Sequence, residues 1–179
     1  MLKIYITDLG AYNSGYLVGE YVELPQDEDV LKEEIQNILK KGQEVCLNLD
    51  EHEEFFITDY IWDNIPVFEV DKYDNIFDLN EKIMLLSTLD DEKLKAVKFL
   101  FEDGYANDIE EAIEKSDEVY IYENQTMKDV AYNYIDQCYD ISNLPSLITS
   151  NIDYKGIGED LRMDGCFVEI DSDIYEYNY

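Results

Sequence analysis

The pattern of apolar and polar residues predicts that the chain opens with strands and a helix. Apolar residues alternate with polar ones over residues 2–8, which predicts a strand, and residues 16–24 predict a second strand. Residues 27–41 instead repeat their apolar positions at helical spacing. Gly42 is predicted to end that helix, because glycine commonly follows a helix C-terminus.

The rest of the chain is predicted to form a helical middle and a mixed end. Further strands are predicted at residues 45–49, 55–60, 119–122, 166–170 and 174–177, and helices at residues 76–86, 93–101, 108–113 and 126–138. Two of these helices begin with a capping-box pattern, Asp108 to Glu111 and Thr126 to Asp129.

The predicted fold class is therefore α+β, built as a chain of three small modules. Residues 1–61 form a small antiparallel sheet plus a helix, and residues 62–116 form a helical middle. Residues 117–179 form a sheet plus helices, and this C-terminal module is the one expected to dimerise.

The charge is the unusual property of this sequence. There are 43 Asp and Glu residues against 13 Lys and Arg residues, which gives a net charge of −30. The three predicted modules carry −10, −9 and −11, so the charge does not come from an acidic tail. Direct binding to nucleic acid is excluded, because phosphate contacts require basic patches. At the charge spacing of duplex DNA, 30 charges correspond to about 50 Å of duplex.

The sequence gives no support for catalysis. The only histidine, His52, is interpreted as an exposed loop residue in an acidic run rather than as a base or a metal ligand. Cys46, Cys138 and Cys166 are expected to be free thiols, and Cys46 to be a structural thiol in a strand. No enzyme activity, metal or cofactor is predicted. With no signal peptide or membrane span predicted, a cytoplasmic location is expected.

Several short strings resemble the antirestriction protein ArdA family when they are taken together. They are IYITDLGAYN at 4–13, GYLVGE at 15–20, DVAYNYI at 129–135, LPSL at 144–147, IDY at 152–154, DL at 160–161 and GCF at 165–167. This resemblance implies an elongated, curved homodimer that copies a bent DNA duplex. It also implies inhibition of type I restriction-modification enzymes, with the methyltransferase core as partner, and carriage on mobile genetic elements. The family's short antirestriction motif is expected within about residues 140–154.

Two sets of residues are expected to carry this function. The acidic surface that binds the partner is expected to include Asp50, Glu51, Glu53, Glu54, Asp90, Asp91, Glu92, Glu110, Glu111, Glu114, Asp117 and Glu118. The dimer interface is expected to consist of apolar residues in a segment poor in charge, namely Ile141, Leu144, Pro145, Leu147, Ile148 and Ile152.

Two alternative origins of the charge stay open. An ordinary halophilic protein is acidic for solvation, and it should unfold in low salt. An acidic decoy could also bind a different basic partner, such as a nucleoid protein or a polymerase, and competition against several DNA-binding proteins would separate these cases.

Overall fold

The computed structural model describes residues 1–46 and 52–178 and divides into two compact units. The N-terminal unit comprises Met1–Lys98 and the C-terminal unit Phe99–Tyr179, so the boundary falls within helix α4 (Asp91–Glu102). The described residues form eight α-helices and two three-stranded antiparallel sheets, which confirms the predicted α+β class. The division into three modules stays a prediction.

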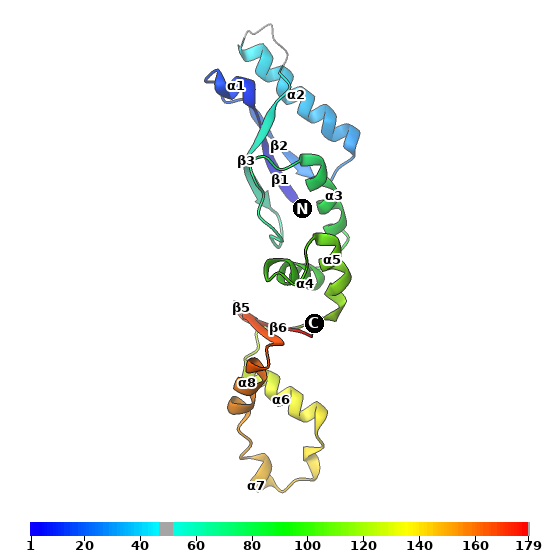
Figure 1. The fold of residues 1–179 in the computed structure, drawn as a ribbon, viewed down its shortest axis with the longest axis vertical. Helices are drawn as coiled ribbons and strands as arrows, with labels where there is room; N and C mark the ends of the chain where they lie inside the picture. The colour runs from blue at the N-terminus through cyan, green and yellow to red at the C-terminus, as the bar shows by residue number, and fades with distance from the viewer. Residues whose placement is uncertain (47–51, 179) are drawn as a thin grey trace. The chain divides into compact units, whose positions relative to one another are not determined.

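The N-terminal unit is a three-stranded sheet covered by one long helix (Figure 1). The strand order is β2 (Gly19–Leu24), β1 (Leu2–Asp8), β3 (Phe55–Trp62), with β1 antiparallel to both neighbours. Helix α2 (Glu28–Cys46) packs its apolar stripe against this sheet. The buried core between them includes Leu2, Ile4, Ile6, Val22, Leu24, Leu31, Ile35 and Ile38. Period-two strands and a period-3.6 helix thus share one apolar layer.

Helix α2 corrects two of the sequence predictions. It continues through Gly42, which was expected to end it, as far as Cys46. Gly42 is buried, and a Cβ atom there would overlap the carboxylate of Asp8 at the end of β1. The glycine therefore permits a close helix–strand contact rather than a helix stop. The strand predicted at 45–49 is wrong at Val45 and Cys46, and residues 47–49 lie outside the described residues.

Helix α3 (Ile76–Leu86) has the range that its apolar spacing predicted. It is attached to the turn between β2 and α2 by the buried side chain of Asn80. The amide of Asn80 accepts from the backbone N–H of Gln26 and donates to its carbonyl, each over 2.9 Å. A short helix, α1 (Leu9–Asn13), follows β1 directly.

The C-terminal unit contains the second sheet and the remaining helices. Its strand order is β4 (Val119–Tyr122), β6 (Asp173–Tyr177), β5 (Phe167–Ile170), which confirms the predicted closing hairpin. The helices are α5 (Ile109–Lys115), α6 (Met127–Cys138), α7 (Ser146–Thr149) and α8 (Tyr154–Met163), with 3₁₀ turns η1 (Ser116–Glu118) and η2 (Ile141–Asn143).

Aromatic stacking and a glycine contact hold the C-terminal unit together. The ring of Phe99 stacks on Tyr175 with centroids 4.9 Å apart, next to an edge contact between Tyr105 and Tyr177. Helices α6 and α8 lie side by side (Figure 1), where Gly158 approaches the backbone of α6. The capping box predicted at Thr126 to Asp129 is confirmed at the start of α6.

Candidate functional site: an acidic surface

Both compact units carry a large excess of negative charge. The N-terminal unit has 23 acidic and 9 basic residues, a net charge of −14. The C-terminal unit has 20 acidic and 4 basic residues, a net charge of −16. The charge is therefore a property of both folded units rather than of one patch, as its even spread along the sequence indicated.

Many of the cations are held by groups of their own unit. Ion pairs join Lys3 to Glu23, Lys32 to Glu28, Lys41 to Glu20, Lys115 to Glu111 and Lys155 to Glu159. The ammonium group of Lys72 lies 4.4 Å from the centre of the Phe56 ring, in a cation–π contact. Because these cations face local carboxylates and rings, the field that a partner meets is dominated by carboxylates.

The predicted acidic residues of the N-terminal unit lie at its surface. Glu53 and Glu54 are exposed just before β3, and Asp90, Asp91 and Glu92 are exposed around the start of α4. Asp90 also accepts a hydrogen bond from the backbone of Lys93 over 2.9 Å and so caps that helix. Asp50 and Glu51 lie outside the described residues.

In the C-terminal unit the predicted residues come together on α5 and η1. Glu110, Glu114, Asp117 and Glu118 are all exposed on this short stretch. Glu110 and Glu114 are four residues apart, a rise of about 6 Å along a helix. Phosphates of one DNA strand advance by about 3.4 Å per base pair, so the rise between these two residues is close to that of two base steps.

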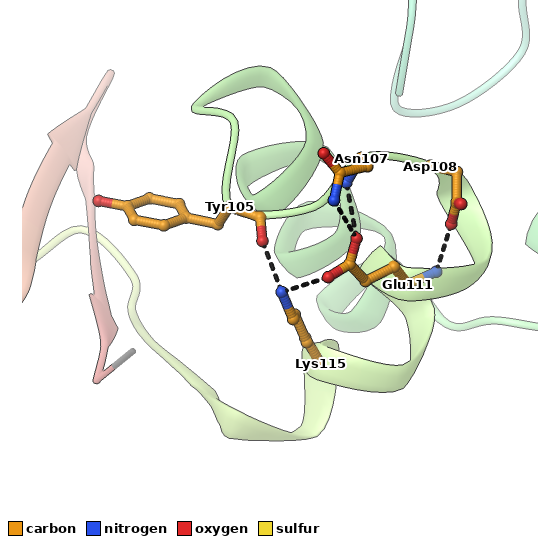
Figure 2. Close-up of polar contacts among 5 residues, drawn as sticks. All are labelled: Tyr105, Asn107, Asp108, Glu111 and Lys115. Carbon is orange, nitrogen blue, oxygen red and sulfur yellow. Dashed lines mark hydrogen bonds and ion pairs between the residues drawn. The ribbon is translucent and has the colours of Figure 1, made fainter.

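Glu111 differs from its neighbours because it is engaged within its own unit (Figure 2). One carboxylate oxygen accepts from the backbone N–H and the side-chain amide of Asn107, each over 2.8 Å, and the other pairs with Lys115 at 2.6 Å. Lys115 in turn donates to the carbonyl of Tyr105. The predicted capping box is thus only half formed. Asp108 accepts from the backbone N–H of Glu111, but the side chain of Glu111 accepts from Asn107 instead of from the backbone N–H of Asp108.

These contacts predict a pH-dependent contribution of Glu111 to stability. The ion pair with Lys115, together with the two donors of Asn107, lowers the pKa of Glu111 from 4.5 to about 2. A carboxyl group with a lowered pKa stabilises the fold above its ordinary pKa, and the benefit is lost as the pH falls from about 4.5 to about 2. Glu111→Gln should therefore be less stable than wild type at pH 7, and the difference should shrink towards pH 2.

Thermal unfolding of both proteins across that pH range checks this expectation. Glu110→Gln, which neutralises an exposed neighbour on the same helix, is the matched control and should follow wild type. A constant difference between Glu111→Gln and wild type at all pH values would contradict the assignment.

The structure corrects the interpretation of His52 as an exposed loop residue. Its side chain is only 6% exposed, and Nδ1 lies 2.7 Å from Oδ2 of Asp8, which is completely buried. The other oxygen of Asp8 accepts from the N–H of Ala11 over 2.9 Å and caps α1. An added Cβ on Gly10 would lie 3.0 Å from the imidazole ring, so the missing side chain there makes room for His52. The pair holds the segment before β3 against the end of β1.

Metal binding and the three cysteines were the remaining candidates from the sequence. Within residues 1–46 and 52–178, no cluster of three or more His, Cys, Asp or Glu side chains could hold a metal ion. Cys46, Cys138 and Cys166 are free thiols, and Cys46 ends a helix instead of lying in a strand. None of the described helices has the length and apolar character needed to cross a membrane.

The predicted dimer residues lie between α6 and α8. Ile141 belongs to η2, Leu147 and Ile148 to α7, and Leu144 and Pro145 to the link between them. Leu144, Leu147 and Ile148 are 42%, 76% and 50% exposed.

One comparison with known proteins identifies a family. The family model described as "Antirestriction protein (ArdA)" matches residues 4–176, a range that extends over both compact units. No curated protein matches the chain.

Proposed function

The chain belongs to the ArdA family of antirestriction proteins, and from this premise we propose that it is a DNA mimic that inhibits a type I restriction-modification enzyme. In this proposal the protein occupies the DNA-binding groove of the enzyme and blocks access of DNA. It acts by binding, without catalysis. Its partner is the methyltransferase core, which the protein would meet in the cytoplasm.

The observation that carries this proposal is the acidic surface of both units. A groove that binds DNA does so largely through Lys and Arg residues that contact phosphates. The two units carry net charges of −14 and −16, and many of their lysines face carboxylates or rings of the same unit. Their carboxylates can therefore contact the Lys and Arg residues of such a groove as phosphates do. Exposed carboxylates four residues apart on a helix, as in Glu110 and Glu114, place negative charges at a rise of about two base steps of a DNA strand.

Competition binding tests the proposal. Labelled DNA bound to a purified type I methyltransferase core should be displaced by the protein. Changing both Glu110 and Glu114 to Gln should weaken displacement about 2- to 30-fold, because each surface charge pair contributes about 0.2–1 kcal/mol. Changing the same two residues to Asp keeps the charge and is the matched control. Binding of the protein and of DNA at the same time, or complete loss of binding from one neutralised carboxylate, would contradict distributed mimicry.

We also propose that two copies associate through the apolar segment between α6 and α8. Residues 141–152 contain no charged side chain, although the whole chain carries −30. Two copies would repel one another through most of their surface, so a contact must use a region poor in charge. A twofold contact in which each copy offers the same segment is the simplest arrangement.

Leu147→Asp should therefore convert the dimer into a monomer. The substitution places a charge on the most exposed apolar residue of the segment, at 76% exposure, where it would face its own copy. Light scattering at micromolar concentration should give twice the chain mass of 21.0 kDa for wild type and 21.0 kDa for the variant. Leu85→Asp, at an exposed leucine of α3, is the control and should stay dimeric. A wild-type mass of 21.0 kDa would refute the dimer.

A further inference from the structure

The N-terminal unit carries an apolar tip that its fold buries only in part. The tip consists of Tyr12 in α1 and of Tyr16 and Leu17 in the loop that leads to β2 (Figure 1). Their exposed fractions are 48%, 46% and 85%. A leucine exposed to this extent contributes little to the core, and DNA mimicry by carboxylates gives it no role either.

The backbone of this tip is held by hydrogen bonds. The N–H groups of Gly15 and Tyr16 donate to the carbonyls of Tyr12 and Ala11 over 3.0 and 2.9 Å. Gly15 has a φ of +86°, a conformation that glycine adopts without strain. Val18, directly after Leu17, accepts from the N–H of Asp8 over 3.0 Å. Leu17 is therefore presented from a backbone anchored on both sides, which reduces the entropy lost when it binds.

Acidic residues lie near the start of α1, the helix that carries Tyr12 of the tip. The backbone carbonyl of Glu54 accepts from the N–H of Leu9, the first residue of α1, over 3.0 Å. Glu53 and Glu54 are exposed, and the buried pair of Asp8 and His52 secures the same segment. The tip thus combines apolar side chains with nearby negative charge, a combination that is complementary to a basic surface containing an apolar pocket.

We propose that the tip, Tyr12, Tyr16 and Leu17, is an apolar anchor that inserts into the basic DNA-binding protein bound by the acidic surface. This rests on the proposed function, since the anchor and the carboxylates contact the same partner. Proteins that read DNA place apolar side chains against thymine methyl groups beside their phosphate contacts. Leu17 meets such side chains in the DNA-binding groove and adds affinity that does not depend on charge.

The salt dependence of binding separates this anchor from the carboxylates. Leu17→Ser should weaken binding to the methyltransferase core about 10- to 100-fold, the value of burying one leucine side chain. The slope of log Kd against log salt should stay that of wild type, because no charge is removed. Glu53→Gln with Glu54→Gln should reduce that slope. Leu85→Ser, at an exposed leucine of the same unit, is the control and should bind like wild type.

Three outcomes would overturn the anchor. If Leu17→Ser binds the methyltransferase core with wild-type affinity, the tip makes no contact with it. In that case the proposed function still stands, provided that binding of the wild-type protein depends on salt. A lower mass of Leu17→Ser in light scattering would assign the tip to contact with a second copy. A wild-type protein that does not bind the methyltransferase core would refute both the anchor and the proposed function. Unfolding temperatures equal to wild type exclude misfolding, and Leu17→Met should retain binding.

Discussion

His52→Ala is expected to lower the free energy of unfolding by about 1–3 kcal/mol, the cost of leaving the buried carboxyl group of Asp8 without the hydrogen-bond partner that His52 provides. The carboxylate of Asp8 is 0% exposed, so water cannot replace the imidazole without opening the contact between α2 and β1. Chemical denaturation monitored by circular dichroism measures the change. Because the pair secures the segment before β3, the loss should be much larger than for a typical surface substitution.

A double mutant tests whether the contact with Asp8 is the cause. Asp8→Asn replaces the carboxyl group but keeps a side chain that can cap α1. In the Asp8→Asn background, His52→Ala should cost clearly less than it does alone, since the carboxyl group that contacts His52 is already absent. Equal costs in the two backgrounds would show that His52 contributes only packing. A loss below about 1 kcal/mol in the single mutant would contradict the pair's role.

The affinity of the protein for its restriction enzyme is expected to fall steeply with salt. If about 6–10 carboxylates take the place of phosphates, the affinity should fall about 10³- to 10⁵-fold between 50 and 200 mM salt. The physical reason is that binding releases the cations that accompany the carboxylates, as DNA binding releases those condensed on the phosphates. Titrations at several salt concentrations give the slope of log Kd against log salt.

DNA binding to the same enzyme provides the reference for that slope. Similar slopes for DNA and for the protein would support a shared groove. An affinity that stays constant across this range would contradict charge mimicry. Unfolding of the free protein at the lowest salt would instead favour a halophilic origin of its charge.

The sequence predicted the elements whose signals are local. Helix α3 was predicted at its observed limits because its apolar residues recur at helical spacing within 11 residues. The capping box of α6 and the closing hairpin were predicted for the same reason, since turn and cap residues act within a few positions. The exposed carboxylates of α5 and η1 were also predicted. The sequence gave no means of ranking them by their contribution to binding, because the chain has so many acidic residues.

The errors arose where a distant residue decides the local structure. Gly42 lies within a helix, and the lack of a side chain there leaves room for Asp8, which is far away in the sequence. His52 is buried because the same Asp8 lies against it. Helix and turn propensities depend on residues that are close in the sequence, so they give no information about either contact. The internal contacts of Glu111 were also not predicted, although Lys115 lies four residues later, a spacing typical of an ion pair on a helix.

The topology of the two sheets gives the charge a second effect. In the described part of the chain, β2 and β3 border one sheet and β4 and β5 border the other. Border strands can pair with strands of other molecules and so start aggregation. Here β2 carries Glu20 and Glu23, β3 carries Asp59 and β5 carries Glu169, in a chain whose copies repel one another at long range. At 1 M salt the screening length falls to about 3 Å. Concentrated salt therefore weakens the repulsion that keeps copies of the protein from aggregating. It weakens the attraction to a basic partner at the same time.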